Sequence, residues 1–128
     1  MAKVMMVDDD PDFLDIQRGV LESRGHEVIT VEKASEAVEA ARREKPDVVV
    51  VDLMMEEEDA GFELCYRFKK GEAGFVPPVV MVTGVASDPG IPFDGGADGG
   101  WIKADAFLNK PIRPEELISA VERLAGGE

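Results

Sequence analysis

Four apolar runs in this sequence end in, or lead directly to, polar groups that could together carry out phosphoryl chemistry. These groups are the acidic run Asp8-Asp9-Asp10, then Asp52, Thr83 and Lys110. Carboxylates within a few ångströms repel one another unless a cation or a proton offsets their charge. Mg²⁺ meets that need, because it takes oxygen ligands and keeps positions open for water and phosphate oxygens.

Each of these positions suits a different part of phosphoryl transfer to a carboxylate. A carboxylate beside the metal can attack phosphorus and form an aspartyl phosphate. The Lys110 ammonium is a compact charge for one phosphate oxygen, and the Thr83 hydroxyl can donate a hydrogen bond to another. Each residue alone also has an ordinary explanation as a helix cap or a turn residue. The prediction therefore depends on the joint pattern.

These residues can act together only if the fold brings them to one place. A parallel sheet does so, because all of its strands end at the same edge. The expected strands are residues 4–7, 28–31, 48–51, 78–82 and 106–108, and helical patterns separate most of them. Strands that alternate with helices predict right-handed βαβ units. Five strands in this length predict an α/β, flavodoxin-like, doubly wound parallel sheet of order 2-1-3-4-5. In such sheets the ligand site lies beyond the carboxyl ends of the strands.

Local features sharpen this expectation. A helix is expected to begin at Pro11, with an aspartate before it as a cap. Its apolar face is expected to hold Phe13, Ile16 and Val20, with Leu14 and Leu21 beside them. The fourth crossover is atypical, because residues 84–100 contain six glycines and two prolines. Glycine and proline disfavour helix formation, so we expect this segment to be mostly loop.

Composition limits the function classes. The 128 residues predict one domain over 1–128, and 14 Lys+Arg against 27 Asp+Glu give a net charge of −13. That charge argues against nucleic acid or an anionic membrane as a partner. One cysteine and an N-terminal stretch too short for a signal peptide or membrane span predict a cytoplasmic protein. The single histidine, His26, is expected to be exposed.

The sequence resembles the receiver domains of two-component response regulators over essentially its whole length. The segments that carry the resemblance are VMMVDDDPDFL (4–14), KPDVVVVDLMM (45–55), PVVMVTG (78–84) and KADAFLNKPIRPEEL (103–117). The resemblance implies that Asp52 accepts a phosphoryl group from a histidine kinase or a phosphotransfer protein. It also implies that the chain is no enzyme beyond catalysing its own aspartyl phosphorylation and dephosphorylation, and that its output goes to a downstream protein partner.

The same resemblance implies roles for the other site residues. Asp8, Asp9 and Asp52, with the backbone carbonyl of Met54, would hold Mg²⁺. By the same resemblance Lys110 is the phosphate-binding lysine. Thr83 and Phe107 would form the conformational switch, in which the added charge draws the hydroxyl inward and the aromatic ring repacks.

The sequence departs from the family pattern in two places, and two alternatives stay open. The loop over 55–61 has no proline and one extra residue, and the segment between Thr83 and Lys110 is long. One alternative is a small haloacid-dehalogenase-like phosphatase that uses Asp8 and Asp10, which leaves Asp52 without a role. The other is a receiver-like interaction module that never carries phosphate.

Overall fold

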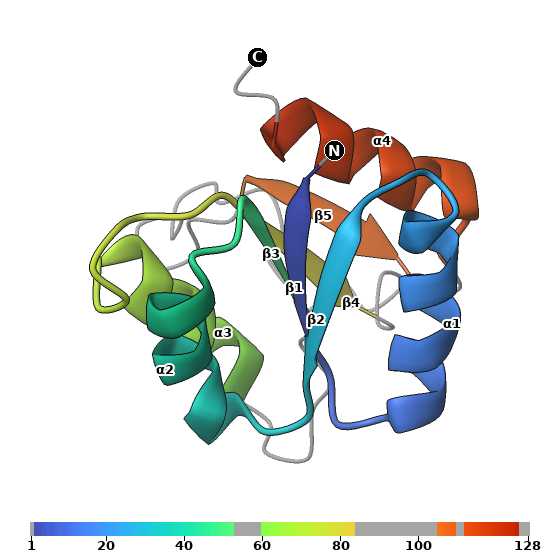
Figure 1. Ribbon diagram of the computed structural model, residues 1–128. Helices are drawn as coiled ribbons and strands as arrows, with labels where there is room; N and C mark the ends of the chain where they lie inside the picture. The colour runs from blue at the N-terminus through green and yellow to red at the C-terminus, as the bar shows by residue number, and fades with distance from the viewer. Residues whose placement is uncertain (1, 53–59, 84–104, 110–111, 126–128) are drawn as a thin grey trace, which may run out of the picture.

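A computed structural model shows a five-stranded parallel sheet with helices on both faces (Figure 1). It describes residues 2–52, 60–83, 105–109 and 112–125. The elements are β1 (Lys3–Val7), α1 (Pro11–Glu22), β2 (Glu27–Val31), α2 (Ala34–Glu44), β3 (Val48–Asp52), α3 (Ala60–Lys69), β4 (Val79–Thr83), β5 (Ala106–Asn109) and α4 (Pro114–Ala125). The observed order β2-β1-β3-β4-β5 confirms the predicted topology. The expected loop over 84–100 lies outside the described residues.

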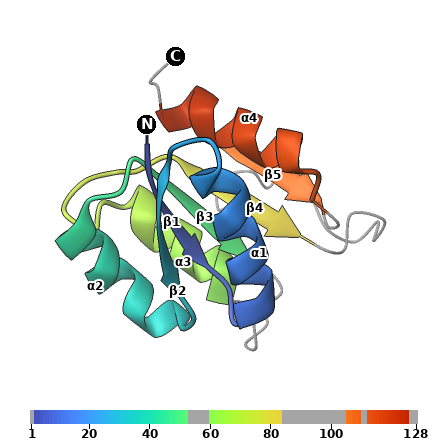
Figure 2. The same cartoon turned by 45° about the vertical axis from the view of Figure 1, so that its right-hand side comes forward.

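The run of four valines in β3 forms the centre of the sheet. β3 pairs with β1 on one side and β4 on the other, and all of its residues are buried. Successive side chains of a strand point to opposite faces. Val49 and Val51 therefore pack toward α2 and α3, while Val48 and Val50 pack toward α1 and α4 (Figures 1 and 2). A strand covered on both faces needs apolar side chains without alternation, which is the pattern seen.

Helix α1 buries most of the predicted apolar face, but not Ile16. The buried residues are Leu14, Gln17 and Leu21, whereas Ile16 is 64% exposed. Phe13 and Val20 flank the buried stripe and are partly buried. The prediction was wrong for Ile16 because apolar residues cover a wide arc of this helix, so their spacing alone does not fix its rotation.

The start of α1 is as predicted. The Asp10 carboxylate accepts hydrogen bonds from the backbone N–H groups of Asp12 (3.0 Å) and Phe13 (3.3 Å). Pro11 occupies the first turn, where its missing N–H group costs no helical hydrogen bond. Asp10, the third aspartate of the acidic run, therefore caps the N-terminus of α1.

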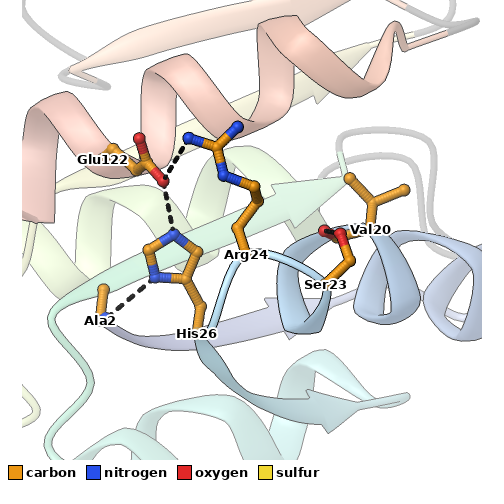
Figure 3. A network of polar contacts seen from close by, with 6 residues as sticks. All are labelled: Ala2, Val20, Ser23, Arg24, His26 and Glu122. Carbon is orange, nitrogen blue, oxygen red and sulfur yellow. Dashed lines mark hydrogen bonds and ion pairs between the residues drawn. The ribbon is translucent and has the colours of Figure 1, made fainter.

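His26 is 8% exposed, so the expectation of an exposed histidine was wrong. Figure 3 shows its ring between the start of β1 and helix α4. The Ala2 backbone N–H donates to Nδ1 (2.9 Å), so the neutral ring carries its proton on Nε2, 2.9 Å from the Glu122 carboxylate. The Arg24 guanidinium lies 3.7 Å from the same Glu122 oxygen. The partners of His26 are distant in sequence, so no local pattern pointed to its burial.

The contacts of Glu122 with His26 and Arg24 make its contribution to the stability of the fold depend on pH. The hydrogen bond from His26, together with the charge of Arg24, holds the pKa of Glu122 below its ordinary value of 4.5. A carboxyl group whose pKa is lower in the folded state stabilises the fold above the unfolded pKa, and this contribution is lost as the pH falls through the folded pKa. We expect Glu122→Gln to be less stable than wild type at neutral pH, with the gap closing as the pH falls below that ordinary value.

Urea unfolding of both chains at neutral and acidic pH measures this gap. A difference in unfolding free energy that stays constant through the acidic range would show that the Glu122 charge has no part in stability.

Candidate functional site

Three carboxylates meet at the carboxyl edge of the sheet. Asp8 directly follows β1 and Asp52 ends the neighbouring strand β3, where Val7 is paired with Val51. Asp8 is 1% exposed and Asp52 is 2% exposed, while Asp9 is partly exposed. One oxygen from each of the three aspartates lies within 4.8 Å of the other two. The structure thus brings together the three aspartates that the sequence predicted.

Backbone groups orient Asp8. Its own N–H donates to the carbonyl of Val31 at the end of β2 (3.1 Å), and its Oδ1 accepts from the N–H of Asp10 (2.9 Å). These bonds hold the turn that carries Asp8 between the sheet and the start of α1. The contribution of Val31 was not predicted, because a backbone carbonyl leaves no signal in the residue type.

The three carboxylates of this cluster repel one another, so a positive charge is needed to stabilise them. Two like charges about 4 Å apart near a protein surface repel by roughly 4 kcal/mol, and Asp8 and Asp52 are almost fully buried. A cation removes this repulsion, and a set of carboxylate oxygens is the donor type that Mg²⁺ prefers. Mg²⁺ usually keeps several waters beside its protein ligands, so three carboxylates leave positions for phosphate oxygens. The residues present therefore fit a magnesium site.

Asp10 lies outside this cluster. It caps α1 through two backbone N–H groups, and it is not one of the three aspartates that share the site. The phosphatase alternative needs Asp10 beside Asp8 as its acid and base. The geometry favours the set Asp8, Asp9 and Asp52 instead.

The other predicted residues are described in part. Thr83 ends β4, beside β3, and is paired with Asn109 at the end of β5, so its backbone reaches the same edge of the sheet. Phe107 lies in β5, opposite Met81, and packs against the core on the α2 and α3 side. The Thr83 side chain, Met54 and Lys110 lie outside what the structure describes.

Among the described residues, no helix has the length and apolar character needed to cross a membrane.

Comparisons with known sequences agree with this geometry. The family model described as "Response regulator receiver domain" matches residues 4–122. Protein PilH of Pseudomonas aeruginosa is 32% identical over 130 residues, which cover 99% of this chain and 100% of PilH. The alkaline phosphatase synthesis transcriptional regulatory protein PhoP of Bacillus subtilis is 32% identical over 122 residues. That match covers 95% of this chain and 48% of PhoP, so the chain spans about half of that relative.

Solved structures are similar over nearly the whole chain. The chemotaxis protein CheY4 of Vibrio cholerae is 28% identical, with a TM-score of 0.78 over 97% of this chain and 98% of CheY4. The receiver domain of the Francisella response regulator 1452 has a TM-score of 0.81 over 99% of this chain and 98% of that chain. At 24% identity, the second likeness concerns the fold alone.

Proposed function

This chain belongs to the response regulator receiver domain family, and from that premise we propose that it is a cytoplasmic phosphoacceptor. A histidine kinase or a phosphotransfer protein would donate the phosphoryl group, and Asp52 would accept it. The observation that carries the proposal is the cluster of Asp8, Asp9 and Asp52 at the carboxyl edge of the sheet. The phosphorylated chain would signal through a downstream protein partner.

The proposed transfer uses the position of Asp52. The phosphorus–nitrogen bond of a donor phosphohistidine breaks as a carboxylate oxygen of Asp52 bonds to phosphorus, and the donor imidazole leaves with the electron pair. Asp52 ends a central, fully buried strand, so its carboxylate is held in place before the donor arrives. Bound Mg²⁺ would supply positive charge for the phosphoryl oxygens. The proposed holders of the ion are the three clustered aspartates and the Met54 backbone carbonyl, and Lys110 would pair with a further phosphoryl oxygen.

The experiment that tests this function is phosphorylation in solution. Acetyl phosphate with MgCl₂ should add one phosphoryl group to the chain, measured as intact mass. The adduct should disappear on treatment with hydroxylamine, because an acyl phosphate is cleaved by that reagent and a phosphoserine or phosphothreonine is not. An unchanged mass, with Mg²⁺ bound, would favour the interaction-module alternative.

Metal binding gives a second prediction. A ligand that binds only the folded chain stabilises it by about 2.7 kcal/mol at 100 times its dissociation constant. We expect saturating MgCl₂ to raise the unfolding temperature of wild type by several degrees and to leave Asp9→Asn nearly unchanged. Asp15→Asn removes an exposed carboxylate on α1 that is not part of the aspartate cluster, and it is the matched control. An equal rise in wild type and Asp9→Asn would place the ion away from Asp9.

The proposed switch gives a third prediction. Thr83 ends the strand beside β3, so its hydroxyl is the proposed group that follows the charge added at Asp52, with Phe107 repacking in β5. We expect Thr83→Ala to gain the phosphoryl group but to show a smaller set of phosphorylation-induced shifts in amide NMR spectra. The same shifts in the variant as in wild type would remove Thr83 from the switch.

A further inference from the structure

A groove opens at the end of the sheet opposite the three aspartates. Residues 42–47 form one wall, at the end of α2 and the turn into β3, and residues 73–78, which lead into β4, form the other. Its volume is about 590 Å³, which is in the range of sites that take small ligands. We call it the Lys45 groove.

The two walls of the groove are tied together. The Arg42 guanidinium donates to the backbone carbonyl of Glu72, so α2 is joined to the segment that follows α3. The Lys69 ammonium donates to the carbonyl of Pro77 (3.2 Å) at the far end of the second wall. These bonds fix the second wall against α2 and α3, so binding needs little rearrangement of the walls.

Lys45 lines the groove and ends α2 in a strained, left-handed conformation. Its φ is +51°, and its backbone N–H donates to the carbonyl of Ala41 (2.7 Å) as α2 ends. Glycine adopts this left-handed conformation freely, whereas a lysine does so at a cost in free energy. Strain of this kind at a non-glycine residue is a reason to look for a function.

The charge of Lys45 is also without a counterion. Three neighbouring cations each lie beside a carboxylate: Lys3 at 3.2 Å from Glu44, Arg42 at 2.7 Å from Glu39 and Arg43 at 3.3 Å from Glu44. In the part of the chain that the structure describes, the Lys45 ammonium makes no ion pair or hydrogen bond. The groove therefore offers one available positive charge.

The opposite wall offers apolar surface. Val76 is 56% exposed, and its Cγ2 rests near Gly71, 3.8 Å from where a β-carbon there would lie. Half-buried Phe75 connects this wall to the core on the α2 and α3 side. An exposed aliphatic side chain and the Lys45 charge in one groove match a ligand with one carboxylate next to an aliphatic group.

We propose that the Lys45 groove binds an acidic, aliphatic segment of a partner protein. A glutamate or aspartate of that segment pairs with Lys45, and a neighbouring aliphatic side chain covers Val76. The charge pattern favours a single carboxylate over a polyanion, because Asp47 lines the groove and Glu44 and Glu72 flank it.

The test is an NMR titration of the full chain with a capped six-residue peptide that contains one glutamate flanked by two leucines, with serine at the other positions. The expected result is a set of amide shifts confined to residues 42–47 and 73–78. The same peptide with glutamine in place of glutamate should bind about tenfold more weakly, because the ion pair with Lys45 is absent. No shifts in the groove, shifts centred elsewhere, or equal binding of both peptides would overturn the proposal.

Two variants separate binding from folding. Lys45→Gly removes the ammonium and relieves the left-handed backbone, so its unfolding temperature should be no lower than that of wild type while peptide binding weakens about tenfold. Arg18→Gln removes one positive charge from α1, where Arg18 pairs with Asp15, and should bind like wild type. Equal weakening of peptide binding in both variants would mean that only the net charge of the chain matters. Unchanged peptide binding by Lys45→Gly would exclude Lys45 from the binding site. Either outcome overturns the proposal.

Discussion

The Asp52→Asn chain is expected to gain no phosphoryl group when it is incubated with acetyl phosphate and Mg²⁺. An amide has nearly the shape of the carboxylate it replaces, but it lacks the anionic oxygen that attacks phosphorus. The substitution also removes one of three clustered negative charges, two of them almost fully buried. We therefore expect the variant to fold at least as stably as wild type. The loss of phosphorylation would then come from the missing nucleophile and not from unfolding of the chain.

The matched control for this variant is Asp12→Asn, which changes an exposed aspartate in the first turn of α1. It should gain the phosphoryl group as wild type does, measured by intact mass under the same conditions. If Asp52→Asn gains mass equally, the nucleophile lies elsewhere. Loss of the adduct in Asp8→Asn, with its retention in Asp52→Asn, would instead support the phosphatase alternative.

Phe68→Ala is expected to destabilise the fold by about 3–5 kcal/mol, because it leaves a cavity as well as losing buried apolar surface. Phe68 lies in α3, is 0% exposed, and belongs to the core between the sheet and helices α2 and α3. A domain of this kind has a total unfolding free energy of about 5–15 kcal/mol. The variant should therefore lose a large part of its stability, measured by urea unfolding.

Tyr66→Ala on the same helix is the control for Phe68→Ala. Tyr66 is 46% exposed, and the Lys70 ammonium lies 5.0 Å from its ring centre. An exposed contact of this type contributes about 0.5–1 kcal/mol, so this variant should stay close to wild type. A similar loss in both variants would show that the burial of Phe68 does not set the effect, since alanine itself favours the helix.

The strands and their order were predictable because each strand carries a strong local signal. The valines of β3 lack any alternation, which is what a strand covered on both faces requires. Since parallel strands end at a common edge, the residue after each strand could be placed without coordinates. The meeting of Asp8, Asp9 and Asp52 follows from that rule and is observed.

Other features were not predictable, because they depend on contacts between distant parts of the chain. The rotation of α1, which buries Gln17 and exposes Ile16, is set by packing against the sheet and α4. The burial of His26 depends on Glu122, which is 96 positions away. In each case the residue type is uninformative, and the tertiary partner decides the outcome.

The central claim is that Asp52 carries the phosphoryl group, and one measurement addresses it directly. Borohydride reduces an aspartyl phosphate to homoserine, so peptide mass spectrometry of the phosphorylated, reduced chain identifies the modified residue. The account predicts homoserine at position 52 and at no other aspartate. Homoserine at position 8, or a phosphorylated chain with none at position 52, would contradict it.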